Sequence, residues 1–182
     1  MDVKVSTEIS IIKRNVPLKQ SPFIREALLR ADEFIATLPG AQSRFDLHSE
    51  SCKKADEMLP LTHTFGDGLY VREIFMPKNH LLTTRIHKTT HPYFILKGDV
   101  SVLTEEGPIR IKAPHHGITK AGTKRLLFIH EDTVWITVHA TKETDVIKIE
   151  EEITAIDYDD LPNNIIETLG EVTKEELCFS KE

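Results

Sequence analysis

The amino-acid sequence predicts a mainly β protein in which short strands form an antiparallel barrel or jelly roll. From Leu69 to about Ile149, apolar and polar residues alternate with a period of two, as in strands with one buried face. Turns that contain Gly or Pro separate these segments, and no segment with a helical period lies between them. We therefore expect a β-barrel over residues 69–149, preceded by an extension of residues 1–68 and followed by an acidic extension of residues 150–182.

The N-terminal extension is predicted to hold an arm, a helix and a loop. Residues 1–20 have a mixed apolar pattern, which fits a strand or an arm that pairs with another subunit. Ser21-Pro22 is typical of a helix start, and Pro39-Gly40 ends the helix. Between them, apolar residues recur at the spacing of one helix face: Ile24, Leu28, Ala31 and Ile35. The polar segment 41–68 is interpreted as a linker or a loop over the sheet.

Within the barrel, the alternating segments predict individual strands. They cover residues 69–76, 80–87, 92–97, 99–104, 109–113, 124–130 and 133–141. Turn residues separate them, including Lys97-Gly98, Pro114 to Gly117 and Glu131-Asp132. In the C-terminal extension, a capping box at Thr173 to Glu176 predicts a short last helix that reaches Phe179.

Composition excludes several classes of protein. The net charge of −6 comes from interspersed acids, whereas a nucleic-acid binder would normally show a basic face. The two cysteines, Cys52 and Cys178, lie far apart and form no C-x-x-C pair, so neither a disulfide framework nor a zinc ribbon is indicated. No apolar run approaches the roughly 20 residues that span a bilayer, and the N-terminus lacks a signal-peptide core. We expect a cytoplasmic protein with no membrane partner.

The segment from Arg85 to His91 is the strongest candidate for chemistry. His87 and His91 lie four residues apart, next to the predicted strand that contains Tyr93. Two imidazoles beside a barrel strand could serve a divalent metal or an anionic ligand. The simpler interpretation is that both are polar barrel residues hydrogen-bonded to their neighbours.

The same segment resembles the first motif of the cupins, H-x-H-x-x-x-E followed by a glycine. With Gly98 as the anchor, Arg85 occupies the place of the first histidine, His87 matches the second, and His91 occupies the place of the glutamate. The second motif, P-x-G-x-x-H-x-x-x-N, falls on Lys120, Gly122, Arg125 and Ile129, where only the glycine matches. The resemblance covers about 69–149 and implies the RmlC-like jelly-roll fold.

A narrower resemblance covers Gly122 to Arg125 and His130 to His139. It is similar to a pattern in uncharacterised cupin-like proteins encoded by tailed bacteriophages. This implies the fold and a phage origin, hence a location in the host cytoplasm. It implies no activity.

The resemblance to catalytic cupins implies a metal site of three histidines and a carboxylate on iron, manganese or a similar ion. Here His87 and His91 would be ligands, with His139 as the third, and His130, His80 or Glu73 could complete the set if the barrel brings them close. Arg125 replaces the histidine of the second motif, and a guanidinium cannot ligate a metal and would repel a cation nearby. A divalent metal therefore remains one alternative, and no cofactor is assigned.

The arginines support the other alternative, an anion site. Arg85 and Arg125 would offer planar forks suited to phosphate or carboxylate. Strand alternation places Arg85 with His87 on one face, and Trp135 with Thr137 and His139 on another. A pocket with both faces would suit a nucleotide, a nucleotide-like signal or a sugar phosphate. The predicted ligand-binding residues are Arg85, His87, His91, Tyr93, Lys124, Arg125, Trp135, Thr137 and His139. In the opposing interpretation the arginines are surface charges and Trp135 fills a subunit interface.

Three functions follow from these alternatives. The first is a non-catalytic binder of a small anion, one that sequesters a host nucleotide signal. The second is a metal-dependent cupin enzyme, such as an isomerase, hydrolase, lyase or dioxygenase, and the third is a structural part of a virion. Because Val134, Ile136 and Val138 lie opposite Trp135 on one strand, both strand faces are apolar and we expect a dimer or larger homo-oligomer.

Overall fold

The computed structural model describes residues 22–43 and 46–169. The helices are α1 (Pro22–Ala36), α2 (Glu50–Met58), α3 (Val146–Ile153) and α4 (Asn163–Leu169). The strands are β1 (Leu61–Gly66), β2 (Leu69–Met76), β3 (Leu81–Thr83), β4 (Ile86–His87), β5 (His91–Thr104), β6 (Gly107–Lys112), β7 (His115–Thr119), β8 (Leu126–Ala140) and β9 (Thr154–Ala155). The predicted N-terminal arm and the predicted helix ending at Phe179 lie outside the described residues.

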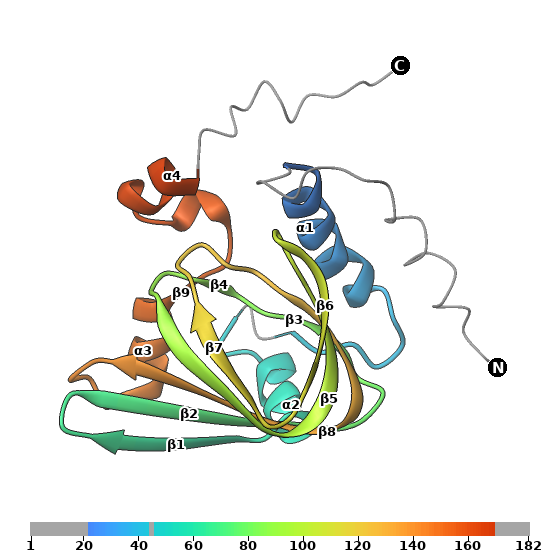
Figure 1. The fold of residues 1–182 in the computed structure, drawn as a ribbon, viewed down its shortest axis with the longest axis horizontal. Helices are drawn as coiled ribbons and strands as arrows, with labels where there is room; N and C mark the ends of the chain where they lie inside the picture. Colours follow the sequence, from blue (N-terminus) through green and yellow to red (C-terminus); the bar gives the residue numbers. More distant parts are fainter. Residues whose placement is uncertain (1–21, 44–45, 170–182) are drawn as a thin grey trace.

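The strands form an antiparallel sheet that curves into a barrel, which confirms the predicted mainly β fold with an antiparallel barrel. The order in the sheet is β1-β2-β8-β5-β6, with β3 paired to β8 and β7 paired to β5. A separate two-stranded sheet joins β4 and β9. Figure 1 shows β5 and β8 curving together through the barrel, with α1 on one side next to β3 and α3 on the other side.

A bulge bends the two long strands. The pairing of β5 with β8 shifts register between Ile95 and Val100, and Gly98 sits in this stretch with a φ of 112°. A Cβ atom at Gly98 would lie 2.1 Å from the side-chain oxygen of Thr133, so only glycine fits there. The predicted turn at Lys97-Gly98 is therefore wrong, because β5 continues through it as a bulged strand. The predicted break at Glu131-Asp132 is wrong in the same way, since β8 is continuous.

Three other segments differ from the sequence prediction. Residues 41–68 contain α2 and β1, and β1 pairs with β2 over its whole length. The predicted break from Pro114 to Gly117 is partly strand β7, and the predicted strand 80–87 is divided into β3 and β4.

The helix predicted after Ser21 is confirmed as α1. The strand expected to run to Thr141 is followed by α3, which crosses the predicted boundary at residue 150.

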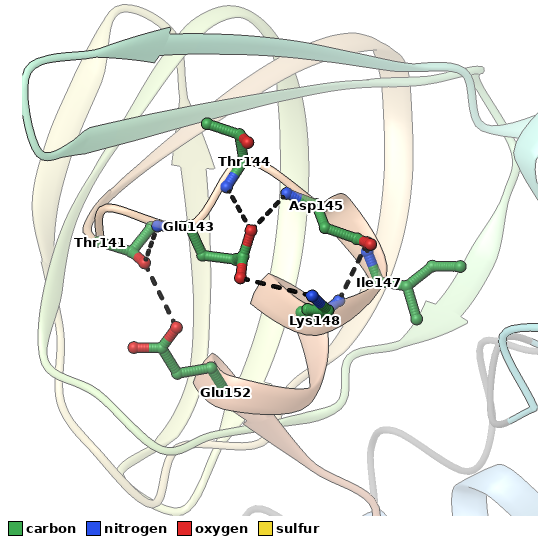
Figure 2. Close-up of polar contacts among 7 residues, drawn as sticks. All are labelled: Thr141, Glu143, Thr144, Asp145, Ile147, Lys148 and Glu152. Atoms are coloured by element: carbon green, nitrogen blue, oxygen red, sulfur yellow. Dashed lines mark hydrogen bonds and ion pairs between the residues drawn. The ribbon is translucent and has the colours of Figure 1, made fainter.

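A network of polar contacts fixes the start of α3, as Figure 2 shows. The Asp145 side chain accepts hydrogen bonds from the backbone N–H groups of Ile147 and Lys148, at 3.0 and 3.4 Å. The Glu143 carboxylate accepts from the N–H groups of Thr144 and Asp145, and these bonds lower the pKa of Glu143. This cap orients α3 so that Glu150 is buried against the barrel.

The main core lies inside the barrel. Its buried members are Met76, Ile95, Val100, Val102, Ile111, Leu127, Ile129 and Trp135. A second cluster, which includes Ile86 and Ile165, packs under α4. Within residues 22–43 and 46–169, we find no helix with the length and apolar character that a membrane span requires.

Candidate functional site

A cavity of about 670 Å³ opens between the inner face of the sheet and the segments α1, α2 and 37–43. Six of the predicted ligand-binding residues line it: Arg85, His87, Arg125, Trp135, Thr137 and His139. The register of β8 against β2 explains three of them. Trp135, Thr137 and His139 pair with Ile74, Arg72 and Tyr70, so these alternate positions face inward together.

The other three predicted residues do not line the cavity. His91 is buried beside His87 and His139, and Tyr93 stacks against Trp135 with ring centroids 4.9 Å apart. Lys124 is fully buried, and its Nζ atom lies 2.7 Å from the Asp32 carboxylate of α1. Lys124 therefore holds α1 against the barrel instead of facing the cavity.

Arg125 is the most unusual residue of the cavity wall. Its side chain is buried, with a relative exposure of 7%, so it is not the surface charge of the alternative interpretation. One guanidinium nitrogen donates to the Thr119 hydroxyl at 2.7 Å, and the group lies 5.6 Å from the ring centroid of Tyr93 and 5.7 Å from that of Trp135. Burial lowers the pKa of Arg125 to about 10, so the side chain remains charged at neutral pH.

Within residues 22–43 and 46–169, no carboxylate forms an ion pair with Arg125. The acidic groups on the cavity wall have other partners. Asp32 pairs with Lys124, and Glu150 lies 3.7 Å from the Nε atom of Arg72. Among the residues that the structure describes, the buried positive charge at Arg125 is therefore matched by the hydroxyl of Thr119 and the two aromatic faces.

Two further arginines line the same cavity. Arg85 donates to the Thr154 hydroxyl at 3.3 Å. Arg72 reaches the cavity from β2 and was not among the predicted ligand-binding residues. Strand alternation could have predicted its place, because Arg72 shares the inner face of β2 with Tyr70 and Ile74.

The predicted histidines form a close cluster. Ring centroids are 4.5 Å apart for His87 and His91, 4.2 Å for His91 and His139, and 6.4 Å for His87 and His139. His91 Nδ1 lies 2.9 Å from the carbonyl oxygen of Thr89, which assigns it as the donor and leaves Nε2 with a lone pair. Among the described residues, this Nε2 atom and the Nδ1 atoms of His87 and His139 have no hydrogen-bond partner.

All three imidazoles are held in the neutral form. Burial lowers the pKa of His87 well below its usual value, and repulsion from His91, were it protonated, and from the charged Arg125 lowers it further. Burial also lowers the pKa of His91, and it lowers that of His139 to about 3. Neutral imidazoles can hydrogen-bond to a ligand through either nitrogen, according to the tautomer.

A divalent metal does not fit this cluster as it stands. The neutral imidazoles have the protonation state of metal ligands. However, within the described part of the chain no three His, Cys, Asp or Glu side chains are arranged to hold a metal ion. The charges of Arg125 and Arg72 are close enough to depress the pKa values of the histidines, and they would repel a cation in the same way.

Comparison of the sequence with family models and with curated proteins gives no match. Solved structures that resemble part of the chain include an RmlC-like cupin family protein from Methanocaldococcus jannaschii, with a TM-score of 0.40 and 14% identity over 46% of this chain and 80% of that one. A predicted oxalate decarboxylase from Thermotoga maritima has a TM-score of 0.39 and 14% identity over 46% of this chain and 80% of that one.

A putative ethanolamine utilization protein from Salmonella typhimurium has a TM-score of 0.40 and 13% identity, over 47% of this chain and 71% of that one. All three similarities cover less than half of this chain. They concern the fold of the barrel and carry no argument about a ligand or an activity.

Proposed function

We propose that the protein binds a small organic anion in the barrel cavity and does so without catalysing a reaction. The observation that carries this proposal is Arg125, a buried cation on the cavity wall that pairs with no carboxylate among the described residues. Transferring a charged group from water into a protein interior is costly unless a counter-charge compensates. An anionic ligand would supply that counter-charge.

The surroundings of Arg125 suit recognition of a phosphate or a carboxylate. The rings of Tyr93 and Trp135 and the Thr119 bond hold the guanidinium in place before a ligand arrives. A guanidinium forms bidentate hydrogen bonds with either anion. Arg85 adds positive charge to the same cavity, and Thr137 adds a hydroxyl. The nucleotide-like or sugar-phosphate ligand that the sequence suggested is one subclass of such anions. The role we propose for the binding is sequestration of a small anionic host signal, whichever subclass it belongs to.

Isothermal titration calorimetry with a panel of anions tests the proposal. The panel contains inorganic phosphate, adenosine monophosphate, glucose 6-phosphate and octanoate. We expect at least one of them to bind, and Arg125→Gln to weaken that binding about ten- to hundred-fold, the loss of a hydrogen bond to a charged group. Arg30→Gln is the matched control, because Arg30 lies on α1 with its side chain 73% exposed. Binding that both variants retain would contradict the proposal.

The metal-dependent alternative depends on His87, His91 and His139 as ligands. Their unpartnered nitrogens favour it, but the nearby arginines and the arrangement of the cluster do not. Native mass spectrometry of the protein from its own host separates the two functions. One divalent ion per chain that is lost in His87→Ala, together with turnover, would replace the anion-binding proposal.

The structural alternative is assembly into a larger particle of phage origin. The outer face of the barrel supports self-association, because Phe94, Leu96 and Ile118 are 39%, 57% and 63% exposed on neighbouring strands. We propose a homo-oligomer on this basis. Light scattering of the purified chain gives the subunit number, and Leu96→Glu should lower it if this face is the interface.

A further inference from the structure

We infer that the ligand of the cavity is amphipathic, with one anionic group near Arg125 and an apolar body that extends toward α1 and α2. This inference rests on the proposed function and narrows it to a ligand class, an organic acid with an alkyl or aryl body. Sugar phosphates and nucleotides, whose bodies carry many hydroxyls, are then poor ligands. Polar and apolar side chains occupy different parts of the cavity wall.

The wall changes character along the paired strands β2 and β8. His139 and the pair Arg72–Thr137 lie toward the start of β2. Next comes the pair Ile74–Trp135, and Met76 follows as the last cavity residue of β2. Since Arg72 and Met76 are four residues apart, the change from charged to apolar takes place over about 13 Å.

The change from apolar to charged residues also occurs where β3 and the start of β8 form the cavity wall. Leu82 pairs with Leu127, and both line the cavity. Two residues further, the backbone N–H of Arg125 donates to the Thr84 hydroxyl, and Arg85 follows. The arginines therefore gather at one end of the cavity and most apolar residues at the other, while Asp32 of α1 is paired with Lys124 and hydrogen-bonded to Thr83.

Residues outside the sheet complete the apolar end. α1, α2 and the segments that follow these helices contribute Ile35, Leu38, Met58 and Leu59 to the wall. Three of the nearby polar side chains, those of Gln42, Ser51 and His80, have partners within the protein. The Ser51 hydroxyl donates to Gln42 at 3.3 Å and accepts from the backbone of Ser43 at 2.7 Å, and His80 lies 3.2 Å from the carbonyl oxygen of Pro77.

This distribution discriminates between ligands of equal charge. A hydroxyl-rich body at the apolar end would lose its hydrogen bonds to water and gain few in return. An alkyl body would gain affinity by a factor of about four for each buried methylene, which corresponds to roughly 0.8 kcal/mol. The volume of about 670 Å³ is in the range of pockets that hold drug-sized molecules.

Calorimetric titration of the full chain with straight-chain carboxylates from butanoate to octanoate tests the inference. Inorganic phosphate and glucose 6-phosphate are titrated in parallel. We expect the affinity to rise about four-fold per methylene, and octanoate to bind more tightly than either phosphate compound. Arg125→Gln should weaken every carboxylate by a similar factor, because the anionic group is common to the series.

A matched pair of leucine variants locates the apolar body. Leu38→Ser changes the cavity wall, whereas Leu69→Ser makes the same substitution at an exposed position of β2 outside the cavity. We expect Leu38→Ser to weaken octanoate more than butanoate and Leu69→Ser to change neither.

The possible outcomes distinguish a failure of the inferred ligand class from a failure of the proposed anion binding. If binding depends on Arg125 but not on chain length, the ligand is not amphipathic, but the protein still binds an anion. The same conclusion follows if glucose 6-phosphate binds more tightly than octanoate. Affinity that rises with chain length but ignores Arg125→Gln overturns the orientation we infer. If no carboxylate or phosphate binds at millimolar concentration, the proposed function fails as well.

Discussion

Lys124 and Arg125 are consecutive buried cations, just before β8, whose side chains have different surroundings. Lys124 is fully buried, pairs with Asp32 of α1 at 2.7 Å and donates to the carbonyl oxygen of Thr84 at 2.9 Å. Arg125 faces the cavity, and no described carboxylate pairs with it. The first charge has its counter-ion inside the protein. The second is compensated only in part, and this difference is what distinguishes a structural cation from a binding one.

Breaking the structural pair should have the largest effect. Lys124→Met leaves Asp32 without its counter-ion next to the barrel, so we expect the free energy of unfolding to fall by about 3 kcal/mol. Urea unfolding at neutral pH measures the change. The double variant Lys124→Met with Asp32→Asn should recover part of the loss, and a single variant that unfolds like the wild type would show that the pair does not anchor α1.

On the same cavity wall as Arg125, His139 should make the free energy of unfolding depend on pH. His139 has a pKa of about 3 in the folded protein, against about 6.5 in an unfolded chain. Between these values the unfolded chain binds more protons, so the stability that His139 contributes is complete above about pH 6.5 and is lost as the pH falls. From about pH 7.5 to about pH 5 the free energy of unfolding should fall by roughly 2 kcal/mol for this residue.

Urea unfolding of the variants His139→Gln and His116→Gln at both pH values checks this prediction. His116 is exposed on β7, so it serves as the control. The loss of stability should be smaller in His139→Gln than in the wild type and unchanged in His116→Gln. An equal pH dependence in all three proteins would contradict the assigned pKa.

Removing the binding cation should cost little stability. Arg125→Met takes away a partly compensated buried charge but also the Thr119 bond and the contacts with two rings. We expect the free energy of unfolding of the ligand-free protein to stay within about 1 kcal/mol of the wild-type value, because the two effects oppose each other. A loss comparable to that of Lys124→Met would make Arg125 a structural residue as well.

The smallest predicted effect is on the titration of His87. The charge of Arg125 lowers the pKa of His87, whereas the charge of Lys124 is offset by Asp32. Arg125→Met should therefore raise the pKa of His87, and the Lys124→Met, Asp32→Asn double variant should leave it unchanged. Proton NMR of the imidazole C–H resonances over a pH series measures both, and equal shifts would remove the electrostatic distinction between the two cations.

The sequence predicted the fold class and much of the cavity wall, since both follow from the alternation of residues along strands. Trp135, Thr137 and His139 share a face for this reason. The same rule applied to β2 would have added Arg72. It could not show which of two adjacent cations faces inward, because Lys124 and Arg125 precede β8 and have no strand period to follow.

Other features depended on contacts between distant segments. Gly98 looks like a turn residue in the sequence, and only its approach to Thr133 shows that the chain continues as a bulged strand. β1 is mostly exposed along its length, so it lacks the apolar alternation that identifies a strand. The apolar end of the cavity is built by α1, α2 and 37–43, whose positions over the barrel are set by tertiary contacts.

The bulge at Gly98 lets β8 keep one parity along its whole length, because the inner position of β5 changes from odd at Ile95 to even at Val100. The inner positions of this strand are odd-numbered and carry Trp135, Thr137 and His139, while the even positions Val134, Ile136 and Val138 form its outer face. A slip by one residue would exchange the two sets and replace a polar, aromatic wall with three aliphatic side chains. The identity of the site therefore depends on β5 absorbing its extra residue at the bulge, two residues along β8 from Trp135, so that the register of β8 is not disturbed.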